Sequence, residues 1–137
     1  MVADAINTSC NVVSQLKWPN DIMARKKKIG GILIESKIGS ESINSVIGIG
    51  LNINQSENQI PFELRKTASS LKIISGDIVN KKMLLNTIID DFFNVIENDN
   101  KDIIKKWESL CCHIDKQVKF HENKKINEGK FLGINKT

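Results

Sequence analysis

Three stretches of this 137-residue chain say most about its fold: Lys17-Trp18-Pro19-Asn20-Asp21, Lys28-Ile29-Gly30-Gly31-Ile32-Leu33-Ile34-Glu35 and Gly48-Ile49-Gly50-Leu51-Asn52-Ile53-Asn54. The first is typical of a short strand that a proline and an Asn-Asp pair end in a turn. The second and third have the pattern of strands, and the polar segment between them favours an antiparallel hairpin. Gly48 and Gly50 are two apart and fall on the same face, and glycine weakens a strand interior unless another backbone or a ligand comes close.

The segments around these stretches predict helices and a second pair of strands. Apolar residues repeat at spacings of three and four over 80–97, which indicates a helix with Asn80 as its N-cap. Asn127-Glu128-Gly129 is a hairpin signal in the tail. The expected elements are a helix end over 2–14, a strand over 16–18, a basic connection over 25–28, strands over 29–37 and 43–54, a mobile loop over 55–66, helices over 80–97 and 102–110, and strands over 117–121 and 130–134.

Composition limits the class of protein. Hydrophobic residues make up 40% and charged residues 26%, which is globular usage, and the length suits one domain with at most a small appendage. No apolar run approaches the length of a membrane span and no secretory signal is visible, so we expect a cytoplasmic protein with no membrane association. The formal net charge of +4 suits an anionic partner but by itself supports only solubility and steering.

The three cysteines, Cys10, Cys111 and Cys112, do not form the pattern of a disulfide framework, so we expect reduced thiols. Cys111, Cys112 and His113 together with His121 could in principle form a metal site. Neighbouring residues rarely converge on one ion, and the short fixed spacings of structural zinc sites are missing. Packing and surface roles are therefore the better interpretation.

Two lysines carry the strongest chemical signal. Lys17 stands just before a turn fixed by Pro19, so its ammonium group can be aimed at an anion, and lysine suits phosphate as a compact point charge. Lys28 precedes Gly30 and Gly31, where a ligand could lie against bare main chain while the amine bridges two oxygens of a carboxyl–phosphate mixed anhydride. Taken alone, the basic run over 25–28 is a solvated charge run.

The other candidates are weaker on their own. Asn20 and Asp21 can make the turn, or they can reach a ribose hydroxyl or a magnesium-bound water. Asn52 can read an adenine edge or cap the end of its strand, and Trp18 is more often a packing residue than a ligand platform. Glu35 is expected to be a cross-strand charge partner, because no paired carboxylate for acid–base work is identifiable.

Together and in this order, the three stretches resemble the central part of the catalytic domain of biotin protein ligases, the biotin–[acetyl-CoA-carboxylase] ligase family. The resemblance implies an α+β fold with a mixed or antiparallel sheet packed by helices, similar to class II synthetases. It also implies a partial catalytic domain over 1–112 and the start of an incomplete SH3-like β-barrel over 113–137. The family's glycine- and arginine-rich biotin loop, which lies upstream of the Lys-Trp-Pro-Asn-Asp segment, has no counterpart before Lys17, so we expect a partial chain.

The resemblance also implies an activity and its residues. Members of the family join ATP and biotin as biotinyl-5′-AMP and transfer the biotinyl group to a lysine of biotin carboxyl carrier protein, with Mg²⁺ as cofactor. Lys28 would then contact the biotin carboxyl and the α-phosphate, and Lys17 the ATP phosphates. The remaining binding candidates are Asn20 and Asp21 for nucleotide and magnesium, Gly30 and Gly31 along the adenylate, Asn52 near adenine, and Trp18 within the signature.

Several alternatives stay open at this stage. The chain is expected to have no DNA-binding domain, and a homodimer or an upstream ligase fragment is a possible partner. A second hypothesis is a non-catalytic remnant or interaction module that keeps part of a nucleotide-binding surface. A third is a small nucleic-acid binder that uses Lys26 to Lys28, although no aromatic-lined basic surface or recognition helix is evident.

Overall fold

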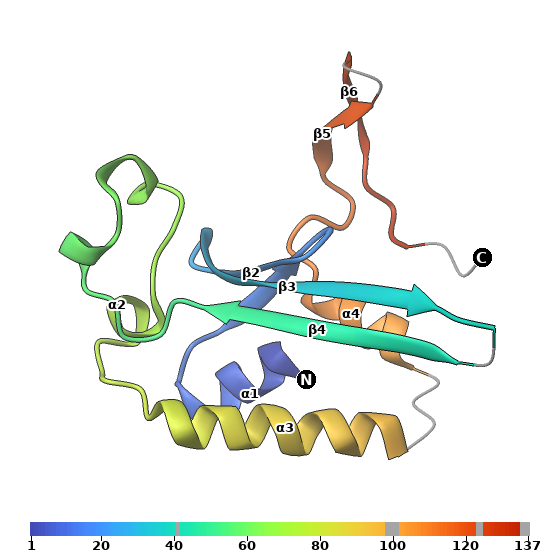
Figure 1. The fold of residues 1–137 in the computed structure, drawn as a ribbon. Coiled ribbons are helices and arrows are strands. Elements are labelled where there is room, and N and C mark those ends of the chain that lie inside the picture. The colour runs from blue at the N-terminus through green and yellow to red at the C-terminus, as the bar shows by residue number, and fades with distance from the viewer. Residues whose placement is uncertain (41, 98–101, 123–124, 135–137) are drawn as a thin grey trace.

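The main element of the fold is a four-stranded antiparallel sheet. The computed structural model describes residues 1–40, 42–97, 102–122 and 125–134 (Figure 1). The strands follow the chain order β1-β2-β3-β4, and each pairs with the next in antiparallel register. Their bounds are β1 (Ser14–Lys17), β2 (Asp21–Ala24), β3 (Lys27–Ile38) and β4 (Ile43–Leu51).

Helices pack on the sheet, and a small second sheet follows them. Figure 1 shows α1 and α3 below the long β3–β4 hairpin, and the β5–β6 hairpin projecting above it. The bounds are α1 (Val2–Ser9), α2 (Leu71–Ser75), α3 (Lys81–Glu97), α4 (Ile103–Leu110), the 3₁₀ helices η1 (Glu57–Gln59) and η2 (Phe62–Leu64), β5 (Gln117–Glu122) and β6 (Lys125–Lys130). The predicted α+β class, with an antiparallel sheet packed by helices, is confirmed. No helix in the described residues is both long and apolar enough to span a membrane.

The hydrophobic core joins the sheet to its helices. Its largest fully buried apolar side chains are Ile6, Ile22, Ile29, Leu71 and Leu84, which come from α1, β2, β3, α2 and α3. Burying an aliphatic side chain of this size contributes about 1.5–3 kcal/mol relative to exposure. These contacts hold the sheet on its helices, so the opposite face of the sheet is free to carry a site.

The predicted long helix and central hairpin are confirmed. The Asn80 Oδ1 atom accepts a hydrogen bond from the backbone N–H of Met83 at 3.1 Å, as expected for an N-cap. Within that helix, however, only Leu84 and Ile88 are buried, while Leu85 and Ile96 are exposed. The described part of the chain therefore covers only part of the apolar face of α3.

The basic run over 25–28 is not a simple connection, and the expectation that it is one was wrong. Arg25 and Lys26 form the two-residue turn between β2 and β3, and both have left-handed φ angles, 46° and 64°. This is the backbone of the tight hairpin turns that match strand twist. Strand β2, which the sequence analysis missed, exists because this turn folds Asp21–Ala24 back onto β3.

Other boundaries also differ from the expected ones. The first helix ends at Ser9 rather than near 14, and Asn11 then takes a left-handed φ of 49° before β1 begins at Ser14. The segment over 55–66 contains η1 and η2. The turn expected at Asn127-Glu128-Gly129 is wrong, because these residues lie inside β6, where Gly129 is close to the Phe120 ring instead of forming a turn. The connection itself falls at 123–124, outside the described residues.

Candidate active site

A cavity of about 880 Å³ lies on the face of the sheet where the ends of all four main strands meet. Lys17, Lys26 and Lys28 line it, so we call it the lysine cavity. Asp21 is the carboxylate among its lining residues, and the segment after η2 closes one side. The two lysines that the sequence singled out, Lys17 and Lys28, therefore share one cavity.

One row of cross-strand partners builds the floor of this cavity. Lys17 of β1 pairs with Asp21 of β2, Asp21 pairs with Gly31 of β3, and Gly31 pairs with Gly50 of β4. Residues directly opposite one another in an antiparallel sheet share a face. The register of three strand pairs thus places a cation, an anion and two bare main-chain positions in line.

A β-bulge brings Lys28 to the same face. Gly30 pairs with Ile22, but Lys28 pairs with Met23, so Ile29 is an extra residue on β3. In a regular strand, Lys28 and Gly31 would point to opposite faces, because side chains alternate. The extra residue in the bulge places Lys28 and Gly31 on the same face. As a result, the Lys28 amine reaches Asp21 and forms an ion pair with its Oδ1 atom.

The backbone of Lys28 is held from the other side by the segment that follows η2. Its N–H donates to the carbonyl of Thr67 at 2.7 Å, and its carbonyl accepts from the N–H of Ser69 at 2.9 Å. The Lys27 amine points elsewhere and donates to the carbonyl of Arg65 at 2.7 Å. Fixed backbone hydrogen bonds therefore aim Lys28, while its side chain stays about half exposed at 49%.

The glycines serve two different purposes. A Cβ at Gly31 would lie 3.2 Å from the Asn20 carbonyl and 3.8 Å from the Lys28 amine, whereas one at Gly50 would meet nothing within 4 Å. These two positions leave the cavity floor open. A Cβ at Gly30 would lie 2.4 Å from the Gly50 carbonyl, so Gly30 is required by the close approach of β4. The sequence analysis placed the need for a close backbone or ligand at Gly48 and Gly50, but the close backbone contact lies at Gly30, and a Cβ at Gly48 would meet only the Leu33 carbonyl at 3.8 Å.

Asn52 lies at the edge of the lysine cavity, where it lines the wall. Its side-chain amide donates to the Ser69 carbonyl at 3.0 Å, and its backbone bonds both Ile29 and Leu71. It therefore secures the end of β4 while presenting the rest of its amide group near the cavity. Both uses considered for Asn52 in the sequence are compatible with this position.

Asn20 and Trp18 lie outside the lysine cavity. Asn20 lines a separate cavity of about 520 Å³, and its carbonyl accepts from the Ile32 N–H at 2.9 Å, which ties the turn to β3. Trp18 packs edge-to-face on Trp107 with ring centroids 6.1 Å apart, and it lines a third cavity with His113. Their proposed contacts with nucleotide stay predictions. Lys26, in contrast, lines the lysine cavity although the sequence analysis gave it no role there.

The cysteine and histidine cluster lies beside the site. The Cys111 Sγ atom is 3.4 Å from Nδ1 of His113, and Cys112 Sγ is 3.8 Å from the same nitrogen. Burial lowers the pKa of His113, and the charges of Lys17 and Lys116 lower it further. Burial also raises the pKa of Cys112. Across the described part of the chain, no three His, Cys, Asp or Glu residues converge as metal ligands.

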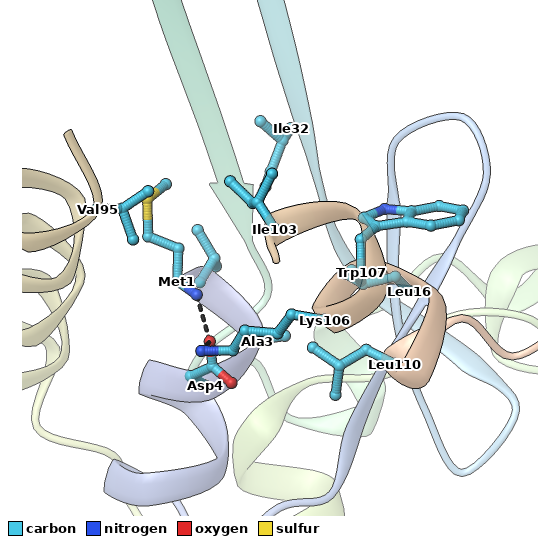
Figure 2. Close-up of a pocket in the computed structure, with 11 residues that line it drawn as sticks. Met1, Ala3, Asp4, Leu16, Ile32, Val95, Ile103, Lys106, Trp107 and Leu110 are labelled. Atoms are coloured by element: carbon cyan, nitrogen blue, oxygen red, sulfur yellow. Dashed lines mark hydrogen bonds and ion pairs between the residues drawn. The ribbon is translucent and has the colours of Figure 1, made fainter. Parts of the chain in front are cut away.

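A smaller cavity of about 210 Å³ opens on the other side of the sheet, between α1 and α4 (Figure 2). Ile32, Ile103 and Trp107 belong to its largely apolar lining. Asp4 accepts a hydrogen bond from the N-terminal amine and lies 3.0 Å from the Lys106 amine. Burial raises the pKa of Asp4, but these two amines lower it by more. With its carboxylate already paired, this cavity lacks the anion-binding chemistry of the lysine cavity.

Comparisons with known proteins identify related chains. The model of the biotin/lipoate A/B protein ligase family matches residues 3–52, which contain Lys17, Lys28 and Gly50. The bifunctional ligase/repressor BirA of Bacillus subtilis is 30% identical over 138 residues, covering 97% of this chain and 42% of its own length. The chain belongs to the biotin protein ligase family. It spans less than half the length of that relative.

Solved biotin protein ligases have the same fold. The apo enzyme from Aquifex aeolicus superposes with a TM-score of 0.76 at 27% identity, covering 98% of this chain and 60% of that one. Its complex with biotin and ATP gives a TM-score of 0.74 at 28% identity, covering 98% and 56%. A biotin–[acetyl-CoA-carboxylase] ligase from Mycobacterium tuberculosis is 43% identical over 56 residues, 41% of this chain and 18% of that protein. The sheet and helices described above are therefore those of biotin protein ligases.

Proposed function

We propose that this chain acts in ATP-dependent biotin–protein ligation, forming biotinyl-5′-AMP and then transferring the biotinyl group to a lysine of biotin carboxyl carrier protein. The single observation that supports this best is the shared cavity of Lys17 and Lys28 above the bare main chain of Gly31 and Gly50. The Aquifex ligase described with biotin and ATP supports the two substrates. The relatives named biotin–[acetyl-CoA-carboxylase] ligases support the acceptor.

In the first step, a carboxylate oxygen of biotin forms a bond to the α-phosphorus of ATP. The bond from that phosphorus to the α–β bridging oxygen breaks, and the electron pair leaves on pyrophosphate, so no proton is gained or lost. We assign Lys28 to the biotin carboxylate and the α-phosphate, and Lys17 to the ATP phosphates. Fixed cations that meet growing negative charge stabilise the transition state more than the ground state.

In the second step, the neutral amine of the carrier lysine forms a bond to the biotinyl carbonyl carbon. The bond from that carbon to the phosphate oxygen breaks, AMP leaves with the electron pair, and the amine releases a proton. Gly30 and Gly31 are proposed to lie along the adenylate, with Asn52 near adenine and with Asn20, Asp21 and Trp18 positioning the nucleotide. The exposed fraction of Lys28, 49%, is compatible with a reaction that must admit a second protein.

Magnesium fits this site through one carboxylate. Mg²⁺ is commonly held by one or two carboxylates together with substrate phosphates rather than by a full protein cage. Asp21 is the carboxylate at the lysine cavity, and we propose that it orients the ion through a bound water. When bound, Mg²⁺ would neutralise phosphate oxygens. Asp21 would then contact the metal–phosphate unit and give up part of its ion pair with Lys28.

The test is adenylate formation and carrier labelling by the purified chain with ATP, Mg²⁺ and biotin. Lys28→Ala should lower adenylate formation by at least about 100-fold, because the charge lost acts at the reacting oxygens. Lys37→Ala removes a lysine from the exposed part of the same strand and should leave the rate unchanged. Equal rates in both variants would contradict the assignment of Lys28. Failure of the chain to make adenylate, even with an upstream ligase segment supplied in trans, would favour the non-catalytic nucleotide-binding module.

We also infer that residues 1–112 form the catalytic unit and that a small SH3-like domain begins at residue 113. Strands β5 and β6 form their own sheet, in support of this division. Within the proposed second unit, the rings of His113 and Phe131 pack with centroids 4.4 Å apart. The Phe131 ring also contacts the Trp107 ring of the catalytic unit, with centroids 6.4 Å apart. Limited proteolysis should cut first near residue 113 and release a catalytic unit. Cleavage first within β3 or β4 would contradict the division.

The two proposed partners, a second copy of the chain and an upstream ligase polypeptide, are supported by the apolar face of the β3–β4 hairpin. Ile34 pairs with Ile47 and Ile38 pairs with Ile43 on one face, and all four are exposed. Sedimentation of the purified chain alone tests the homodimer. Co-purification with a tagged upstream ligase segment tests the other proposal, and Ile38→Lys should weaken whichever association is found.

A further inference from the structure

Lys26 occupies a strained position at the rim of the lysine cavity. It is the second residue of the β2–β3 turn and has a φ of 64°, a conformation that suits glycine or asparagine better than lysine. Backbone conformations of this kind cost about 1–3 kcal/mol and cluster at functional sites. The side chain lines the lysine cavity. Glycine at position 26 would relieve the backbone strain, yet this position carries a cationic side chain that lines the cavity.

The lysines at 26, 27 and 28 have different environments, which separates them functionally. The Lys27 amine is bound to the Arg65 carbonyl, and the Lys28 amine is paired with Asp21. Among the described residues, neither Lys26 nor Lys17 forms an ion pair. The three lysines therefore do not present one continuous row of free amines.

The charge balance of the cavity points to a particular class of ligand. Three ammonium groups and one carboxylate line it, which leaves two positive charges in excess. A carboxylate alone carries one negative charge, and a phosphate monoester carries about −2 at neutral pH. The diphosphate anion carries more charge than either and spans several oxygens. Two unpaired lysines on separate elements, Lys17 at the end of β1 and Lys26 in the β2–β3 turn, suit such an extended anion better than a compact one.

We propose that Lys26, together with Lys17, forms a subsite for condensed phosphate, and that Lys26 binds the pyrophosphate end of the anion. This inference rests on the proposed function, because pyrophosphate is the leaving group of the adenylation step. When the bond to the α–β bridging oxygen breaks, the electron pair moves onto pyrophosphate. A lysine at the turn is placed to stabilise that charge while Lys28 stays with the α-phosphate. Lys26 is thus a binding residue for the leaving group.

The test compares Lys26→Gln with Arg25→Gln in the full chain. Both variants remove one positive charge from the same two-residue turn at similar φ, so their effects on folding are matched. The probe is inorganic pyrophosphate in metal-free buffer, measured by calorimetry. Lys26→Gln should weaken binding about fivefold and Arg25→Gln less than about twofold, as for loss of one partly solvated charge contact. Lys26→Arg should restore binding, and orthophosphate should show a smaller loss than pyrophosphate.

Equal losses in the two variants would overturn the subsite, because they would reflect the general charge of the turn. Absence of pyrophosphate binding by the wild-type chain would overturn it as well. The measurement needs neither biotin nor carrier protein. A chain that binds pyrophosphate through Lys26 yet makes no biotinyl-AMP would therefore support this inference while contradicting the proposed function.

Discussion

The amine of Lys28 forms an ion pair with Oδ1 of Asp21 across the β2–β3 hairpin, at the floor of the lysine cavity. In the free protein, the Asp21 carboxylate neutralises the positive charge of Lys28. In the proposed reaction, that charge contacts the substrate instead. Asp21→Asn should therefore strengthen binding of pyrophosphate in metal-free buffer, by about fivefold for one partly exposed charge. The same substitution should lower Mg²⁺-dependent adenylate formation, because the metal loses its carboxylate. Calorimetry and an adenylate assay measure the two effects.

The opposite signs make this prediction specific. Since the pair is partly exposed, its removal should change the free energy of unfolding by less than about 1 kcal/mol. Urea titration of Asp21→Asn provides that control. Weaker pyrophosphate binding in the variant would show that Asp21 supports anion binding by orienting Lys28 rather than by competing with the anion.

Gly30 and Gly50 should respond in opposite ways to the same substitution. An alanine Cβ at position 30 would lie 2.4 Å from the Gly50 carbonyl, while one at position 50 would meet no atom within 4 Å. Gly30→Ala should lower the free energy of unfolding by about 2 kcal/mol, as for overpacking, and Gly50→Ala should leave it nearly unchanged. Gly50→Ala should instead weaken ATP binding, because its methyl group would enter the lysine cavity. Urea denaturation and ATP titration of both variants check this, and equal stability losses would contradict it.

The central hairpin was predictable because turn and strand signals in that region are local, whereas a shared site for Lys17 and Lys28 followed only from the resemblance to biotin protein ligases. Proline with Asn-Asp ends β1, and polar residues separate β3 from β4. The bulge at Ile29 was not predictable, since it depends on how β2 pairs with β3. The face of the sheet on which Lys28 lies depends on this pairing. It could not be predicted because the sequence analysis did not identify β2.

The missed residues have tertiary causes as well. In the sequence, Lys26 belongs to a run that is typical of a solvated charge cluster, and its turn has no local signal because left-handed hairpin turns usually contain asparagine and glycine rather than Arg-Lys. Helix α2 did leave a local signal: Ser70 caps its start, accepting from the Ile73 N–H at 3.2 Å, and Gly76 ends it with a φ of 89°. The structural use of Asn52 depends on the Ser69 carbonyl, which only the folded chain brings close.

Asn54 should be a stability residue rather than a binding residue. Its amide donates to the Val79 carbonyl and its Oδ1 accepts from the Val79 N–H, both at 2.9 Å, so one side chain replaces a backbone pair. Asn54→Ala should cost about 2 kcal/mol, at about 0.5–1.5 kcal/mol for each bond. Thermal and urea unfolding measure the loss. Asn54→Asp would set a carboxylate oxygen against the Val79 carbonyl and should lose at least as much, and an alanine variant as stable as wild type would contradict the clamp.

His113 should make the stability of the chain depend on pH in the range where histidine titrates. Burial, followed by the charges of Lys17 and Lys116, lowers the pKa of His113 in the folded state below its ordinary value. As pH falls through about 6.5, the unfolded chain therefore binds more protons than the folded chain, and stability decreases. Urea titrations between about pH 7 and pH 5 should show a steeper loss for wild type than for His113→Phe, which keeps a ring beside Phe131. His121 is present in both proteins, so an identical pH dependence would contradict the role of His113.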